Sequence, residues 1–184
     1  MPSATRPSSR DKVNALSRRS WCLILSLAWI LHDSEEWLLA PQMLQFMQSE
    51  APDFVRHVYA GITVPELQAV LLILTSVVLV VIALAAVFAS TATAAFGTMV
   101  LAALLGLNAV FHIALSIGTG AYAPGLLTAV MVSLPIAIAL LVQARRQRWT
   151  SMPAFLAVVP AAVLVHGPVL GALFKVSLSM VRAA

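Results

Sequence analysis

The chain has 184 residues, of which 61% are hydrophobic and 10% are charged, and its mean hydropathy is +0.96. This composition lies far outside the range of soluble domains and predicts a polytopic membrane protein. The isoelectric point near 10 comes from basic residues in two clusters beside hydrophobic runs, which indicates membrane topology rather than nucleic-acid binding. The single cysteine, Cys22, excludes an intrachain disulfide and a thiolate metal site.

About five spans of about 20 residues, joined by short loops, account for the length of the chain. We therefore expect an all-α, polytopic membrane bundle of about five transmembrane helices, forming a single domain at 20–175. Residues 1–19 are polar, basic and rich in helix breakers, which predicts a disordered cytoplasmic tail, and 176–184 is expected to be a short tail. The first hydrophobic run lacks a clear cleavage site, so the N-terminus is expected to stay in place.

The first predicted span, 20–40, contains the sequence His32-Asp33-Ser34-Glu35-Glu36. Each charged residue at the centre of a membrane helix costs about 2.5–3.5 kcal/mol, so three unpaired carboxylates would cost roughly 8–10 kcal/mol. At 100° per residue, Glu36 lies about 40° from His32 and Glu35 about 60° away on the other side. One imidazole is therefore flanked by two carboxyl groups, and the rest of the bundle is expected to bury and complement them.

The connection at 41–65 is the longest in the chain. Met43, Leu44, Phe46 and Met47 alternate with glutamines at helical spacing, which indicates a short helix at the membrane interface. Such a helix is either a lid over the site or a plain surface connector. His57, in the same connection, is expected to be solvated.

The later spans carry few polar residues. The span at 66–89 is nearly featureless, whereas 95–117 places Asn108 and His112 four residues apart and so on one face. The predicted span at 123–143 begins with the sequence Tyr122-Ala123-Pro124-Gly125. The predicted span at 153–174 contains His166-Gly167-Pro168, a sequence that is prone to kink a helix. We expect His166 to belong to the kink or, as the alternative, to support the site.

Lysine and arginine counts predict the orientation. Five precede the first span and three lie between the fourth and fifth, against Arg56 alone in the long connection. The N-terminus is therefore expected to be cytoplasmic and the C-terminus external, in what we expect to be a bacterial cytoplasmic membrane. With a rise of 1.5 Å per residue, His32, Asn108 and His166 lie roughly 18–20 Å from the cytoplasmic side and His112 roughly 26 Å, so all occupy the outer half.

Three motifs in the same order resemble the HXXEE family of membrane proteins. They are His32-Asp33-Ser34-Glu35-Glu36, a further histidine at His112, and the Tyr-X-Pro-Gly sequence that begins at Tyr122. The resemblance covers the first and third spans and the start of the fourth. It implies an integral membrane protein, suspected of being an enzyme, without a defined activity or substrate.

Imidazole and carboxylate ligands from two helices suit zinc, iron or manganese. A divalent cation would also neutralise two carboxylates. We therefore predict that His32, Glu36 and His112 are metal ligands. Glu35 is predicted to be catalytic, either as a fourth ligand or as the general base acting on a metal-bound water.

Three further residues complete the predicted site. The Tyr122 hydroxyl is protonated at neutral pH and would donate to a developing oxyanion. Asn108 would orient a ligand or bind substrate. Trp29, three residues before His32, would line the site. The other tryptophans (Trp21, Trp37 and Trp149) fit interfacial anchoring.

The predicted function is a membrane metalloenzyme, a hydrolase or an oxidoreductase, acting on a lipid-like or other apolar substrate among the membrane lipids. The alternatives are a proton- or cation-coupled transporter or binding protein that uses the same carboxylates without metal, and a purely structural polar network. Against a transporter, five spans show no evident internal repeat. A weaker alternative is an assembly or sensor subunit, in which the polar cluster would contact a partner helix.

Overall fold

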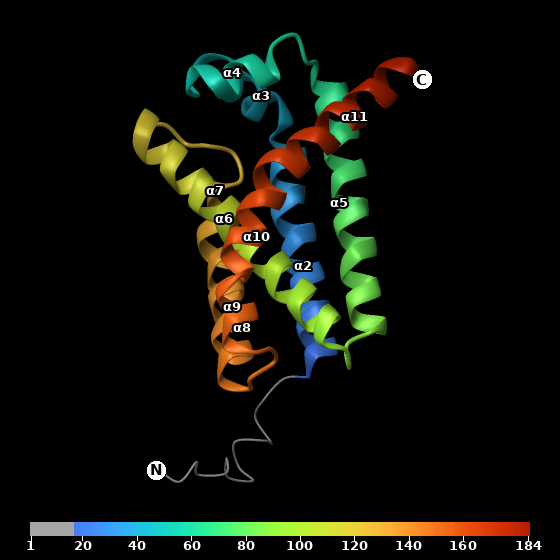
Figure 1. Ribbon diagram of the computed structural model, residues 1–184. Helices are drawn as coiled ribbons and strands as arrows, with labels where there is room; N and C mark the ends of the chain where they lie inside the picture. The colour runs from blue at the N-terminus through green and yellow to red at the C-terminus, as the bar shows by residue number, and fades with distance from the viewer. Residues whose placement is uncertain (1–16) are drawn as a thin grey trace, which may run out of the picture.

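The computed structural model describes residues 17–184, and within them the fold is entirely helical (Figure 1). Of the tail predicted at 1–19, residues 1–16 lie outside the described part of the chain. From Ser17, whose hydroxyl accepts from the backbone N–H of Ser20, the chain enters helix α2 (Arg18–Leu38). The first helix therefore begins two residues before the boundary predicted from the sequence.

The helices follow one another up and down the bundle. After α2 come α3 (Ala40–Ser49), α4 (Asp53–Tyr59), α5 (Val64–Val87) and α6 (Ala92–Thr119). The next crossing is built from α7 (Leu126–Thr128), a π-helical turn η1 (Ala129–Ser133) and α8 (Leu134–Arg146). The last is built from α9 (Met152–Leu156), α10 (Val158–Leu164), a second π-helical turn η2 (Val165–Val169) and α11 (Leu170–Ala183).

Four of these crossings are long and apolar enough to span a bilayer: Val64–Val87, Ala92–Thr119, Leu126–Arg146 and Met152–Ala183. They indicate an integral membrane protein, as predicted. Helix α2 has 21 residues but is not among the four, and its interior carries Asp33, Glu35 and Glu36. Of the about five spans expected, four are therefore supported within the described part of the chain.

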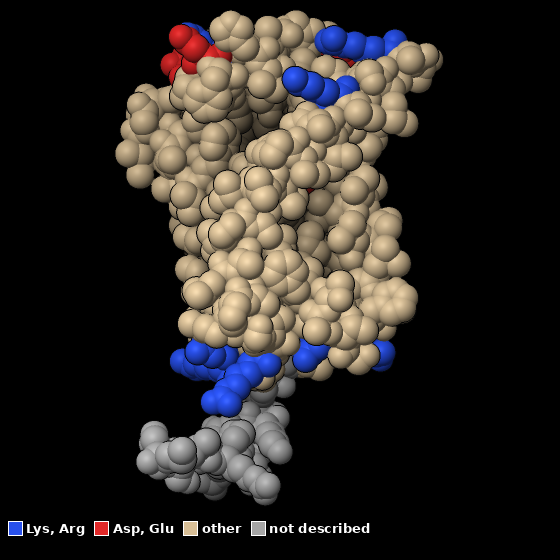
Figure 2. Space-filling model, viewed as in Figure 1, with Lys and Arg blue, Asp and Glu red and all other residues tan. Residues whose placement is uncertain are grey.

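The long helices begin where polar side chains satisfy their first backbone N–H groups. Thr63 and Glu66 form a capping box at the start of α5, and Thr91 caps α6 by accepting from the backbone N–H of Ala94. These caps mark opposite ends of the bundle. Along the face shown in Figure 2, the charged side chains gather at the two ends and leave an uncharged band between them.

Two buried clusters hold the bundle together. The first joins the N-terminal half of α2 to α6 and α8, with Leu25 and Leu105 fully buried. The second lies beneath α3 and α4, where Met47 and Leu67 are buried. The polar residues of α2 and α6 lie between the two clusters along these helices, so apolar packing encloses them from both ends.

The C-terminal end differs from the short tail expected at 176–184. Helix α11 continues to Ala183, and it packs along α5. Arg182 donates to the Glu66 carboxylate at 2.7 Å and to the carbonyl of Gly61 at 3.1 Å. These contacts join the last turn of α11 to the start of α5.

Candidate metal centre

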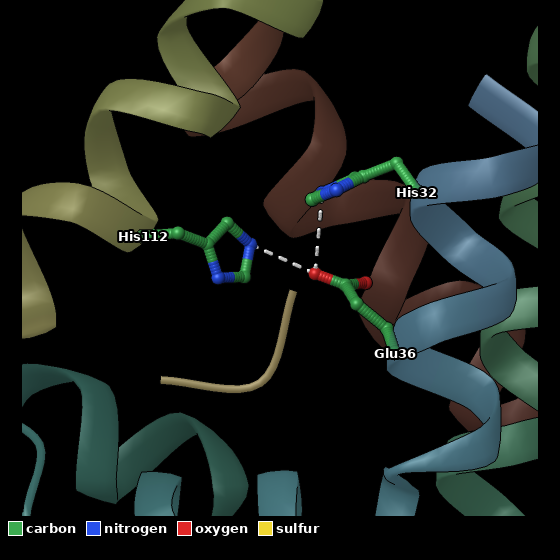
Figure 3. A group of neighbouring side chains, drawn as sticks. All are labelled: His32, Glu36 and His112. Atoms are coloured by element: carbon green, nitrogen blue, oxygen red, sulfur yellow. Dashed lines mark ion pairs between the residues drawn. The ribbon is translucent and has the colours of Figure 1, made fainter. Parts of the chain in front are cut away.

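Three ligand-type side chains meet between α2 and α6 (Figure 3). Glu36 Oε1 lies 2.8 Å from His112 Nε2 and 3.5 Å from His32 Nε2. One ligand atom from each residue lies within 4.8 Å of the others, and the three residues are at most 6% exposed. The structure therefore brings together the three residues that the sequence predicts as metal ligands.

Helix geometry explains this meeting. His32 and Glu36 are four residues apart on α2, so both project from one face toward α6. His112 lies on the opposing face of α6, and its ring meets the His32 ring edge to face with centroids 5.1 Å apart. Two atoms that each lie about 2 Å from one ion are no more than about 4 Å apart, so the group needs only a small contraction to hold an ion.

A hydrogen-bond chain fixes the tautomer of His32. The Thr128 hydroxyl donates to Glu35 Oε2 at 2.6 Å, so its oxygen accepts from His32 Nδ1 at 2.9 Å. His32 Nε2 then carries no proton, and it accepts from the Asn108 side-chain amide at 2.6 Å. The nitrogen that faces Glu36 is therefore the unprotonated one, as a metal ligand requires, and a metal ion would take the place of the Asn108 amide on its lone pair.

Glu35 points away from the three ligand-type residues and into the loop that precedes α7. Its Oε1 accepts from the Tyr122 hydroxyl and from the backbone N–H of Gly125 at 3.1 Å. Its Oε2 accepts from the backbone N–H of Thr128 at 2.8 Å as well as from the Thr128 hydroxyl. Four donors thus satisfy this carboxylate, and they tie the first predicted motif to the Tyr-X-Pro-Gly sequence.

That sequence forms a tight turn in which Pro124 and Gly125 occupy the two central positions. The backbone N–H of Leu126 donates to the carbonyl of Ala123, and Gly125 has φ +96°. Proline followed by a residue of positive φ is typical of a type II turn. A Cβ atom at Gly125 would lie 2.7 Å from His112 Cε1, so only glycine lets the turn approach the imidazole this closely.

Asn108 connects the centre to the last crossing. Besides its hydrogen bond to His32, its side-chain carbonyl oxygen lies 3.4 Å from His166 Nε2. His166 is half-buried in η2, and the Phe111 ring packs against both His166 and His112. His166 thus lies beside the centre, within the π-helical turn that contains Pro168, without joining the three ligand-type residues.

A cavity of about 230 Å³ opens beside the centre. Its polar wall includes Glu36, Asn108, His112 and His166, and Trp29 lines it as the sequence predicts. The rest of the wall is mainly apolar, and α3 and α4 contribute to it: Met43, Met47, Val58 and Tyr59. The long connection therefore covers the site, which favours the lid over the plain surface connector.

Asp33 is a residue of the site to which the sequence analysis assigned no role. It lines the cavity and also a groove of about 410 Å³ between α2 and α5. Its carboxylate accepts from the Thr75 hydroxyl at 2.5 Å. The adjacent hydroxyl residues Thr75 and Ser76, within the apolar run of α5, were the signal that could have identified this contact.

Two other predicted placements differ in detail. Tyr122 donates to Glu35 instead of facing the three ligand-type residues, and it is half exposed. His57 is exposed, as expected, but its Nδ1 lies 2.6 Å from the carbonyl of Asp53 in the preceding turn. Thr128, which the sequence analysis did not single out, links both His32 and Glu35.

Both tyrosines of the chain have a raised side-chain pKa. Burial raises the pKa of Tyr122, and its hydrogen bond to Glu35 raises it further. Burial also raises the pKa of Tyr59 in the lid, with the nearby Glu36 charge adding to the effect. Both phenols therefore remain donors throughout the neutral range.

Comparison with known proteins gives one match. A family model described as a protein of unknown function with HXXEE motif matches residues 23–140. The matched segment contains His32, Glu36, His112 and the loop from Tyr122 to Thr128, but not His166. No curated protein and no solved structure matches the chain.

The raised tyrosine pKa values predict the alkaline titration. In the folded protein, neither phenol should be half ionised at pH 10, whereas both should titrate near pH 10 after denaturation. Because folding favours the protonated phenols, their contribution to stability is complete below about pH 10 and is lost as the pH rises through the folded-state pKa values. Phenolate absorbance checks this, with Tyr122→Phe assigning one transition. A titration midpoint at or below pH 10 for either phenol in the folded protein would contradict the raised pKa of that tyrosine.

Gly125→Ala should destabilise the protein more than Gly120→Ala. Both glycines have positive φ, so both substitutions cost on the order of 1 kcal/mol in backbone strain. Only the Cβ at position 125 meets another group, the His112 imidazole, whereas nothing lies within 4 Å of a Cβ at position 120. Thermal unfolding in detergent measures the difference. Equal losses for the two variants would show that the turn does not press on His112.

Proposed function

We propose that this chain, which belongs to the HXXEE-motif family of proteins of unknown function, is an integral membrane metalloenzyme. In this proposal His32, Glu36 and His112 bind one divalent metal ion, and the substrate is lipid-like or otherwise apolar. The observation that carries the proposal is the meeting of three buried ligand atoms within 4.8 Å of one another, beside a cavity.

Electrostatics supports a cation at this position. A buried carboxylate needs a compensating charge, and removing one partner from a buried ion pair typically costs about 3–5 kcal/mol. Glu36 is 6% exposed and has two imidazoles as its nearest polar partners. A divalent ion would supply that charge, and three protein ligands with a free position are typical of catalytic zinc sites. Such an ion would supply Lewis-acid chemistry for a hydrolase, whereas iron or manganese would suit an oxidoreductase.

The surrounding residues have separate roles in this proposal. Glu35 and Thr128 hold His32 in the tautomer that offers Nε2, because the Thr128 hydroxyl donates its hydrogen bond to Glu35 and accepts from His32 Nδ1. Glu35 is therefore assigned to positioning rather than to proton transfer, and Tyr122 to fixing Glu35. Asn108 and Trp29, which line the cavity, are assigned to substrate binding.

A second candidate has its own supporting observation. The Asn108 amide already satisfies His32 Nε2, and Glu36 already contacts both imidazoles, so the cluster is internally paired without a metal. A protein that moves or binds a proton or another cation would use the same carboxylates in this way. Metal content separates the two candidates.

We also propose that α2 is a fifth span. It has 21 residues, about 32 Å, and it packs along α5, which is one of the four apolar spans. Its acidic residues are consistent with a span because Asp33 and Glu36 contact α5 and α6 rather than the bundle's outer surface. The basic residues at its start support a cytoplasmic N-terminus, and the proposal includes a bacterial cytoplasmic membrane as the location.

Metal analysis tests the function. Protein purified in detergent should carry about one equivalent of zinc, iron or manganese per chain, and His112→Ala and Glu36→Gln should lose it because each removes a ligand. His57→Ala is the matched control, since this histidine is exposed on α4, and it should keep the metal. Thermal unfolding shows whether each variant is folded. A folded wild-type protein without metal, in which ion or proton flux into vesicles depends on Glu36, would establish the second candidate instead.

Cysteine accessibility tests the fifth span. In a Cys22→Ser background, an Asp53→Cys variant should react with a membrane-impermeant maleimide in intact cells, because α4 would face outward. Ser90→Cys, in the turn between α5 and α6, and Ser8→Cys should react only after the membrane is permeabilised. Labelling of positions 8 and 53 from the same side would show that α2 does not cross the membrane.

A further inference from the structure

We propose that the cavity beside the metal centre binds a long-chain amphiphile with an uncharged polar headgroup, such as an alcohol, ester or amide. This inference rests on the proposed function and names the substrate class of that site. The headgroup lies at the polar end of the cavity, and the hydrocarbon chain lies against its apolar wall.

The cavity lining falls into a polar and an apolar group. Asp33 and Glu36 on α2, Asn108 and His112 on α6, and His166 on η2 belong to the polar group. The apolar group comes mainly from the lid, α5 and α11. Its members include Met47, Val58, Leu74, Leu170 and Phe174. This division suits a ligand with one polar end and one apolar end.

Two buried ring nitrogens in residues of the cavity wall have no hydrogen-bond partner among the described residues: Trp29 Nε1 and His112 Nδ1. When His112 Nε2 binds a metal, its Nδ1 carries the proton, so both nitrogens are donors. Both atoms are closed off from the cavity, so a headgroup with acceptor oxygens would satisfy them only by turning the rings toward it.

Charge balance restricts the headgroup further. Asp33 and Glu36 are the two carboxylates that line the cavity, and together they balance one divalent ion. Glu35 does not line it, and its oxygens are occupied by donors from the loop. A fatty acid or an alkylamine would therefore bring an uncompensated charge into a buried site, which an alcohol, ester or amide would not.

The setting of the cavity accommodates the hydrocarbon chain. Its walls include three candidate membrane spans, and Asp33 and Leu71 also line the neighbouring groove of about 410 Å³ between α2 and α5. In Figure 2 the surface is hollowed beside α11. A membrane lipid therefore has apolar surface to follow toward the centre without leaving the bilayer.

Gly171 allows the cavity to be filled without disturbing the fold. It lines the cavity on α11, and a Cβ atom there meets nothing within 4 Å. Gly171→Phe therefore adds a ring at the cavity wall, where it is expected to narrow the space for the chain. Gly118→Phe is the matched control, because Gly118 on α6 is also free of contacts within 4 Å but does not line the cavity.

The experiment uses a long-chain primary alcohol that carries a photoreactive diazirine, with full-length protein in detergent. Mass spectrometry should map labelling to α4, α5 or α11, and Gly171→Phe should raise the half-saturating concentration by roughly tenfold or more. Gly118→Phe should match the wild type. An unlabelled alcohol of the same length should compete better than the corresponding fatty acid or alkylamine.

Each outcome decides one part of the inference. Equal labelling of Gly171→Phe and wild type would overturn the cavity as the binding site, and equal competition by a charged amphiphile would overturn the uncharged headgroup. Gly171→Phe should keep its metal, because the substitution lies away from the three ligands. A wild type that lacks metal but shows the expected labelling would refute the metalloenzyme while leaving the amphiphile site supported.

Discussion

The burial of Glu36 between two imidazoles is the constraint on which the structure depends. Its oxygen lies 2.8 Å from His112 and 3.5 Å from His32, and the three side chains are at most 8% exposed. A carboxylate in this environment is tolerated only while its partners stay in place. Helices α2 and α6 must therefore meet at this level. Thr128 of α7 holds the His32 ring by a hydrogen bond, and Gly125 in the turn before α7 lies against the His112 ring.

This arrangement gives the three sequence motifs one physical explanation. The first motif supplies His32 and Glu36 to the centre and Glu35 to the loop, so its adjacent glutamates face different neighbours. The further histidine, His112, completes the ligand group. The Tyr-X-Pro-Gly sequence forms the turn that binds Glu35 and lies against His112. The motifs are separated along the chain but form a single contact network.

Helical periodicity and depth were sufficient to predict part of this network. The four-residue spacing placed His32 beside Glu36, and counting residues along each span placed Asn108 and His112 in the same half of the membrane. The role of Glu35 was not predictable in this way, because it depends on how the turn at Pro124 folds back onto α2. The contacts of Asp33 with Thr75 and of Tyr59 with the cavity likewise arise from packing between distant segments. The helical C-terminus was missed because its ion pair joins Arg182 to Glu66, on a different span.

The two π-helical turns have a mechanical consequence for the crossings that contain them. Each residue advances an α-helix by about 100°, and a π-helical turn absorbs one extra residue, so the helix on either side of it differs in rotational phase. η1 begins directly after Thr128, and η2 contains His166. In each crossing, the side chains that face the centre therefore point in directions that are set separately from those of the side chains packed in the core. A rotation of one end of the helix can thus be accommodated without repacking the other end.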